Sequence, residues 1–263
     1  MGATDHDALR AMEENMAVHL AHLPRHLHGG MVRDENDILL VDSGLPSDTF
    51  NAVCRARLEE DGAQQRITWA IGHFQTNQHP FTWWVGPTST PCDLGERLMA
   101  SGLSHGEVEV GMTLDLRDWP GQTAPPPGVE IRRVRTAAQL RDYVRVIAAN
   151  WEPPDMSVQQ VYERAAAEAL RPACPARYFL GSIDGEPVAT SECFLAHGVA
   201  GIYNVVTMPR ARRRGLGTAL TAAALHEARA QRYAIAVLQA SSSGQRIYTR
   251  LGFTPEGEFQ EYH

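Results

Sequence analysis

Hydrophobic and polar positions alternate most clearly between residues 129 and 263. Leu140, Val144 and Ile147 recur at helical spacing, and Thr136 precedes them as a good N-cap residue. This pattern predicts a helix from Thr136 to about Ala149. The same reasoning predicts further helices at 157–170, 215–231 and 245–251, and strands at 129–134, 177–183, 187–195, 201–207, 234–239 and 256–262.

A hairpin and the order of the elements define the expected architecture of this half. Asp184-Gly185 separates two predicted strands and is a strong signal for a tight turn. The element order, with strands and helices mixed, predicts an α/β (α+β) fold with a mixed sheet and helices on both faces.

The first half is less clearly patterned. We expect helices at 5–23 and 93–100 and strands at 38–41, 50–57, 82–85 and 108–116, whereas 67–78 is compatible with either structure. The segment from Thr82 to Leu103 has the same strand, loop, helix, glycine order as Val237 to Phe253. That similarity is either a degenerate internal repeat or a chance match. Within it, Trp83 and Trp84 lie on opposite faces of a strand, where they pack in a core or line a pocket.

A proline-rich segment divides the chain. Residues 118–128 contain three consecutive prolines, which favour extended backbone and donate no hydrogen bonds. We therefore expect domains at 1–117 and 129–263, joined by a semi-rigid linker at 118–128. The total of 263 residues is sufficient for two domains at roughly 100–200 residues each.

Composition and charge exclude several functions. Acidic residues outnumber basic ones by 31 to 24, a net charge of −7, which disfavours nucleic-acid binding through a basic surface. All basic residues other than histidine are arginine, which excludes lysine-based phosphate loops and Schiff bases. The four cysteines form no Cys-x-x-Cys pair. Residues 1–20 do not resemble a signal peptide, and no apolar run reaches the roughly 20 residues of a membrane span. A soluble, cytoplasmic protein with no membrane partner is expected.

The most informative segment follows the predicted strand 201–207. Arg212, Arg213 and Arg214 precede Gly215-Leu216-Gly217, where a long helix is expected to begin. Unpaired backbone N–H groups and the helix dipole make such a turn suitable for an anion, and arginines add charge-assisted bonds to phosphate. A solvated basic turn before an ordinary helix is the alternative.

Together with Tyr248-Thr-Arg-Leu-Gly-Phe253, this loop resembles the GNAT superfamily of N-acetyltransferases. The resemblance implies a GNAT fold in the second half and, more faintly, a degenerate GNAT-like domain in the first, a tandem arrangement. It implies that acetyl-CoA is the co-substrate. The implied cofactor-binding residues are Val205, Val206, Thr207, Arg212, Arg213, Arg214, Gly215, Leu216, Gly217, Thr218 and Ser241; at the position of Ser241, many members carry asparagine.

The resemblance also implies catalytic roles. Tyr248 matches the tyrosine whose hydroxyl faces the CoA sulfur, where a phenol can protonate the departing thiolate. The alternative is an aromatic side chain packed beside Phe253. Several members carry a glutamate near the position of Gly201, which cannot act as a base. Glu192, inside an apolar strand, is the substitute that we predict, against the alternative of a solvent-facing strand residue.

Weaker candidates are Glu152 and Asp155 near the expected acceptor site, which either bind a cationic substrate or only cap the helix, and His197 at a turn. His19, His22 and His26 share a helix face with His28 just beyond, but no cysteine or carboxylate accompanies them, so no metal is expected.

The function expected from these residues is transfer of an acetyl group to an amine of a small molecule, in a monomer or homodimer. A non-catalytic acyl-CoA sensor or interaction protein and a peptide or protein N-acetyltransferase remain alternatives. Because the first half lacks the Arg-x-x-Gly-x-Gly pattern, no second catalytic centre is expected there, and its expected role is to wall the acceptor site.

Overall fold

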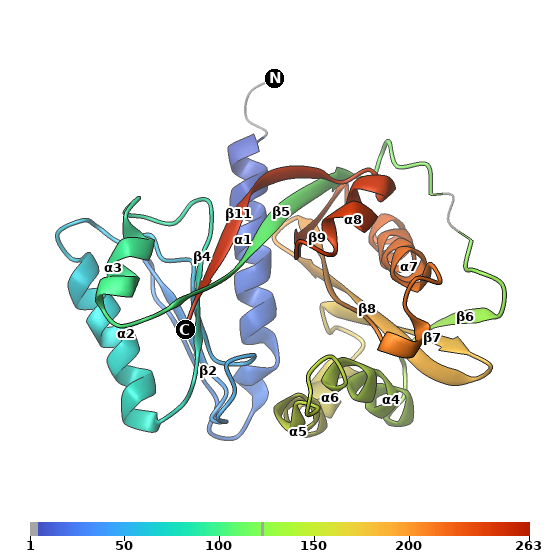
Figure 1. Ribbon diagram of the computed structural model, residues 1–263, viewed down its shortest axis with the longest axis horizontal. Coiled ribbons are helices and arrows are strands. Elements are labelled where there is room, and N and C mark those ends of the chain that lie inside the picture. The colour runs from blue at the N-terminus through green and yellow to red at the C-terminus, as the bar shows by residue number, and fades with distance from the viewer. Residues whose placement is uncertain (1–4, 122–123) are drawn as a thin grey trace. The chain divides into compact units, whose positions relative to one another are not determined.

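The computed structural model describes residues 5–121 and 124–263 (Figure 1). The chain forms two compact units. Unit 1 comprises residues 1–111, 239–242 and 256–263, and unit 2 comprises 112–238 and 243–255. The C-terminal residues 256–263 therefore group with unit 1, although they follow the second half in sequence. Residues 122 and 123 of the predicted linker lie outside the described residues.

Unit 2 contains a mixed sheet in the order β10-β9-β8-β7-β6, in which β9 and β10 are parallel and the other pairs are antiparallel. Asp184 and Gly185 both have positive φ and form the predicted tight turn between β7 and β8. The strands are β6 (Val129–Arg133), β7 (Ala176–Ile183), β8 (Glu186–Ala196), β9 (Val199–Thr207) and β10 (Ile235–Ala240).

Helices cover both faces of this sheet, as the sequence predicts (Figure 1). Ser191 donates a hydrogen bond to the Leu220 carbonyl of α7 at 2.9 Å, whereas the next residue, Glu192, faces α4. The helices of unit 2 are α4 (Ala137–Ala148), α5 (Met156–Arg164), α6 (Ala166–Ala169), α7 (Leu216–Ala230) and α8 (Gln245–Leu251), with a 3₁₀ turn at Pro209–Ala211.

The ends of the helices follow from local chemistry. Thr136 and Gln139 form a reciprocal capping box that starts α4, as predicted. The predicted helix over 157–170 is wrong in detail, because Ala165 leaves helical geometry and separates α5 from α6. Asp155 accepts a hydrogen bond from the Ser157 N–H at 2.7 Å and so caps α5.

The first part of the predicted linker packs on unit 2. Trp119 is buried, its carbonyl accepts a hydrogen bond from Arg229 of α7 at 3.0 Å, and its ring lies 4.8 Å from that of His226. This part of the segment is therefore anchored to the long helix of the same unit.

Unit 1 contains a sheet in the order β1-β2-β3-β4-β11, with β3 and β4 parallel and α2 crossing between them. The helix α2 resolves the ambiguous segment 67–78, and β1 was not predicted. The elements are α1 (Asp5–His22), a 3₁₀ turn (Pro24–His26), β1 (Met31–Asp34), β2 (Leu39–Asp42), β3 (Ala52–Cys54), α2 (Ala63–Asn77), β4 (Thr82–Val85) and α3 (Leu94–Ala100); β5 (His105–Asp115) and β11 (Thr254–Tyr262) run through the unit boundary.

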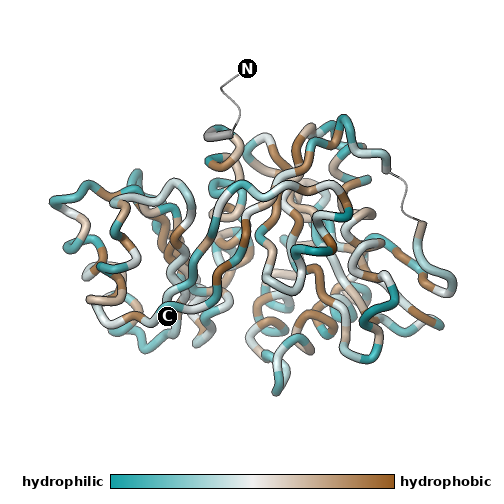
Figure 2. Tube along the Cα trace, turned by 45° about the horizontal axis from the view of Figure 1, so that its top comes forward, coloured by the Kyte–Doolittle hydropathy of each residue, from teal (hydrophilic) through white to brown (hydrophobic). Residues whose placement is uncertain are grey.

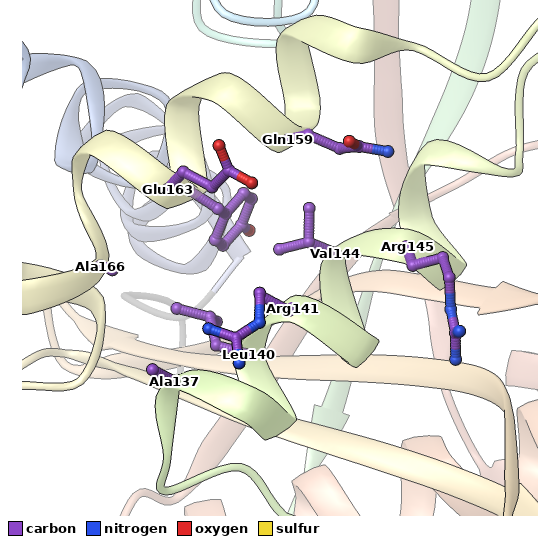
Figure 3. Close-up of a pocket in the computed structure, with 9 residues that line it drawn as sticks. Ala137, Leu140, Arg141, Val144, Arg145, Gln159, Glu163 and Ala166 are labelled. Carbon is purple, nitrogen blue, oxygen red and sulfur yellow. The ribbon is translucent and has the colours of Figure 1, made fainter.

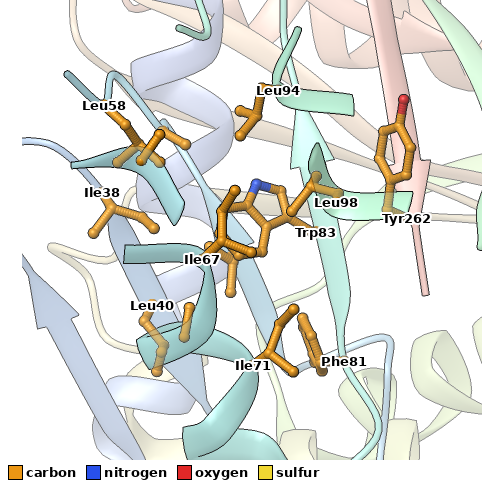
Figure 4. Close-up of a cluster of buried hydrophobic side chains, with 14 of the residues drawn as sticks. Ile38, Leu40, Leu58, Ile67, Ile71, Phe81, Trp83, Leu94, Leu98 and Tyr262 are labelled. Carbon is orange, nitrogen blue, oxygen red and sulfur yellow. The ribbon is translucent and has the colours of Figure 1, made fainter. Parts of the chain in front are cut away.

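The two tryptophans of β4 serve as packing residues. Trp83 is fully buried in a cluster with Ile67 and Leu98 (Figure 4). Trp84 packs on the opposite face against a second cluster that contains Ala17. Stretches of hydrophobic and hydrophilic residues alternate along the trace, as the patterning of strands and helices requires (Figure 2).

A carboxyl group in unit 1 gives a pH prediction. Burial, together with the charges of Glu261 and Glu107, raises the pKa of Glu109 from 4.5 to about 7. The folded state therefore binds the Glu109 proton more tightly than the unfolded state does. The free energy of unfolding falls as pH rises from the pKa of Glu109 in the unfolded chain through its folded-state pKa of about 7. We expect Glu109→Gln to raise the free energy of unfolding by about 1–3 kcal/mol at pH 8 and by less at pH 5. Denaturant titration at both pH values measures this, and an equal effect at both would contradict it.

Candidate active site

An open strand edge lies at the centre of unit 2. The register of β9 with β10 includes only Ala200 and Gly201, which pair with Ala236 and Val237. Further along, β9 continues to pair with β8 on its other side, up to Thr207. Among the described residues, no strand therefore pairs with residues 202–207 of β9 on the edge that faces β10. The predicted cofactor residues Val205, Val206 and Thr207 lie on this segment and are half-buried.

The arginine-rich loop connects this strand to α7. Arg212, Arg213 and Arg214 are all exposed, and Arg213 has a positive φ of 62°. Arg212 Nε donates to the Thr207 carbonyl at 3.1 Å, which folds the loop back toward the end of β9. A guanidinium carries five N–H donors, so this single bond leaves others for an anion.

The start of α7 has the geometry that an anion site needs. Gly215 is the N-cap with φ of 80°, a left-handed conformation that other residues adopt at a cost, and a Cβ there would lie 3.2 Å from Pro126 Cγ. Among the residues that the structure describes, no side chain caps this end of the helix, so its first backbone N–H groups keep their capacity for a ligand. Leu216 is buried and fixes the first turn on the core.

Tyr248 lies on α8, which packs beside the start of α7. Its neighbour Ile247 would be 3.6 Å from a Cβ at Gly217, so α8 adjoins the first turn of the long helix. The Tyr248 ring contacts Phe253 edge to face, with centroids 5.9 Å apart, and is half-buried. Tyr248 therefore packs beside Phe253, as the alternative interpretation of this residue expects.

Glu192 is buried rather than solvent-facing, with 2% of its surface exposed. Its Oε2 accepts a hydrogen bond from Asn204 Nδ2 at 2.8 Å and one from the Tyr143 hydroxyl at 3.4 Å. Asn204 has φ of 50°, close to the irregularity in register between β8 and β9, and its carbonyl accepts from Thr190 Oγ1 at 2.8 Å. A carboxylate at the centre of unit 2 is thus held by two donors.

Three tyrosines surround this carboxylate. Burial raises the pKa values of Tyr143, Tyr162 and Tyr178 well above 10, and the nearby Glu192 contributes to each shift. The three phenols therefore remain protonated at neutral pH and can donate hydrogen bonds. Sequence reasoning missed Asn204 and these tyrosines; a polar residue in an otherwise apolar strand was the available signal for Asn204.

A cavity of about 390 Å³ lies between α4 and the helices α5 and α6 (Figure 3). Leu140 and Val144 form part of its apolar wall, Arg141 and Glu163 come from opposite helices, and Tyr162 also lines it. The hydroxyl of Tyr162 lies 3.4 Å from Asn204 Nδ2. Asn204 also donates to Glu192, so it links this wall of the cavity to the carboxylate.

The remaining candidates have other surroundings. Glu152 is exposed, Asp155 caps α5, and His197 lies in the exposed turn between β8 and β9. Ser241 groups with unit 1. Among the described residues, no three His, Cys, Asp or Glu side chains gather in a way that could hold a metal ion, and His22 instead packs against the ring of His26.

A family match covers most of unit 2. Residues 140–253 match the model of the acetyltransferase (GNAT) family. These residues form a GNAT domain. The match includes the open edge of β9, the arginine-rich loop, Glu192 and Tyr248. A comparison with curated proteins returns no match.

Solved structures extend the likeness to the whole chain. A GCN5-related N-acetyltransferase from Kribbella flavida has 20% identity and a TM-score of 0.70, covering 96% of this chain and 94% of that one. One from Sphaerobacter thermophilus has 17% identity and a TM-score of 0.62, over 86% and 79%. A tandem GNAT protein from the clavulanic acid biosynthesis pathway has 14% identity and a TM-score of 0.59, over 100% and 96%. The predicted mixed α/β GNAT fold is confirmed.

In the described part of the chain, every helix is too short or too polar to cross a bilayer.

Proposed function

We propose that this protein is an N-acetyltransferase that transfers the acetyl group of acetyl-CoA to an amine of a small molecule. The observation that carries the proposal is the open edge of β9 leading into an uncapped helix start behind three exposed arginines, inside the GNAT domain. A strand edge can bind the amide groups of the pantetheine arm, and the loop can bind the diphosphate.

The donor set fits acetyl-CoA. Backbone groups of Val205, Val206 and Thr207 would bind the pantetheine arm. The diphosphate would lie against the loop residues Arg212, Arg213, Arg214, Gly215, Leu216, Gly217 and Thr218. Ser241 groups with unit 1 and is left out of this set. When bound, acetyl-CoA supplies an activated thioester.

Glu192 and Tyr248 have opposite tasks in the proposed reaction. The amine nitrogen attacks the thioester carbonyl carbon, so that a C–N bond forms and the C–S bond breaks. Glu192 receives the proton that the amine loses, directly or through water, because most alkyl amines are protonated near pH 7. The Tyr248 hydroxyl donates a proton to the departing sulfur.

We assign acetyl-CoA binding to unit 2 alone, because the equivalent pair of parallel strands in the described part of unit 1 leaves no open edge. There the parallel strands β3 and β4 are followed by further hydrogen bonds, from Thr90 N to the Ala56 carbonyl at 3.0 Å and from Leu58 N to the Thr90 carbonyl at 3.1 Å. These bonds use the backbone groups that an open edge would offer to a ligand. Unit 1 is therefore proposed to be a degenerate GNAT-like domain.

The cofactor loop gives a kinetic prediction. We expect Arg213→Ala to raise the KM for acetyl-CoA about tenfold with little change in kcat, because a charge-assisted bond contributes about 1.5–3 kcal/mol. Steady-state kinetics with varied acetyl-CoA measures this. Arg117→Ala is the matched control, since Arg117 is 72% exposed and pairs with its near neighbour Asp115. A lowered kcat at unchanged KM would contradict the role.

The test of the function is thiol release from acetyl-CoA against a panel of polyamines, aminoglycosides, amino acids and peptides. Activity on free amines supports the proposal. Tight acetyl-CoA binding without release on any amine would indicate a sensor instead, and activity restricted to peptides would indicate a peptide or protein N-acetyltransferase.

A further inference from the structure

A second cavity in unit 2, of about 180 Å³, is lined by four arginines. Arg133 and Arg135 come from the end of β6 and the residues after it, Arg177 from the start of β7, and Arg171 from the segment after α6. At about 30 Å³ per water molecule in the liquid, the cavity has room for about six waters, or for a small anion.

The carboxylates here do not balance the arginines. Arg133 Nη1 lies 3.4 Å from Glu227 Oε1, and Arg177 Nε lies 3.7 Å from the same oxygen, so one carboxylate serves two guanidiniums. Arg171 pairs with Glu168 at 3.0 Å. Four guanidiniums against two carboxylates leave an excess of two positive charges among these residues.

Two further observations mark this excess as unsatisfied. The pKa of Arg133 is lowered, mainly by burial. Glu227 opposes this shift, and the positive charges of Arg177 and Arg135 add to it. The Arg177 side chain is only 14% exposed. Its Nε is buried and has no hydrogen-bond partner within the described residues. Arg177 Nη1 donates to the carbonyls of Cys174 and Ala176, so Nε is the buried donor of this guanidinium that lacks a hydrogen bond to any described residue. A buried charged donor without a hydrogen bond is costly, and an anion that accepts from it removes the cost.

We propose that this four-arginine cavity binds a small dianion of the phosphate type, either free phosphate or the phosphoryl group of a phosphomonoester. Arginine is suited to such anions because its planar fork of donors matches phosphate oxygens. The site is separate from the proposed cofactor loop: Glu227 is twelve residues beyond Gly215 on α7, roughly 18 Å along the helix at 1.5 Å per residue.

The experiment titrates the protein, without acetyl-CoA, with inorganic phosphate and separately with glycerol phosphate. Ionic strength is held constant with sodium chloride, and binding is followed by calorimetry and by thermal unfolding. We expect saturable binding and a rise in Tm for at least one of the two, as linkage requires. Tighter binding of glycerol phosphate would identify the phosphomonoester as the ligand, and tighter or equal binding of inorganic phosphate would identify the free anion.

The double variant Arg135→Gln/Arg171→Gln removes the two exposed arginines of the cavity and leaves the half-buried Arg133 and Arg177. We expect its apparent Kd to be at least tenfold weaker, while Arg117→Gln titrates like the wild type. The proposal is overturned if both ligands act no more strongly than chloride, or if the double variant binds as tightly as the wild type. Acetyl-CoA binding, measured in parallel, is expected to be the same in all three proteins, so failure here is distinct from failure of the proposed transferase.

Discussion

Tyr248→Phe is expected to lower kcat about 100-fold while the KM for acetyl-CoA changes less than threefold. The substitution removes only the hydroxyl, and a positioned general acid contributes about 10²–10⁴ in rate. The ring contact with Phe253 is retained by phenylalanine, so the fold of α8 is preserved. Steady-state kinetics with acetyl-CoA and the best amine of the panel measures the effect.

The control for this prediction is Tyr233→Phe, which removes a hydroxyl from a tyrosine in the turn between α7 and β10 of the same unit. We expect this variant to retain wild-type kcat. If Tyr248→Phe also retains it, Tyr248 is a packing residue and the proposed general acid is wrong. A large loss of acetyl-CoA binding with unchanged kcat would likewise contradict the role.

Glu192→Gln is expected to lower kcat by about 10²–10³. Glutamine has nearly the same shape and keeps a carbonyl oxygen that accepts from Asn204 and Tyr143, but it cannot take the proton of the amine. The acidic limb of the pH profile of kcat, which reports ionisation of the base, is expected to disappear. A uniform loss of rate with an unchanged pH profile would show that the carboxylate is structural.

Asn204→Ala provides the matched variant for this prediction. It removes the 2.8 Å donor to Glu192 and leaves the carboxylate in place. Loss of that donor destabilises the charged form, so the acidic limb is expected to move to higher pH, with a decrease in kcat of about tenfold at pH 7. An acidic limb that stays in place would show that Asn204 does not position the proton acceptor.

Local signals explain why most of unit 2 could be predicted. The capping box at Thr136 and Gln139, the Asp184-Gly185 turn and the helical spacing in α4 each depend on neighbouring residues alone. The division of the predicted helix 157–170 shows the limit of this reasoning. A break at Ala165 has no marker in the sequence, because alanine is itself a strong helix former.

Unit 1 was less predictable because its elements are short or ambiguous. The four residues of β1 are half-buried or exposed, so they lack the alternation that marks a strand. The segment that forms α2 contains buried hydrophobic residues at helical spacing, but its threonines and aromatic residues also suit a strand. The pairing of β11 with β4 joins residues that are far apart in the chain.

The GNAT resemblance, the arginine-rich loop at the start of α7 and the position of Tyr248 could be read from the amino-acid order alone, because each is a run of adjacent residues whose chemistry is local. The hydrogen bonds of Glu192 and the gathering of the four arginines depend on packing between distant elements. Glu192 meets Tyr143 from 49 residues away, and Arg133 meets Glu227 from 94 residues away. Contacts of this kind are set by how the sheet and helices pack, and no local pattern encodes them.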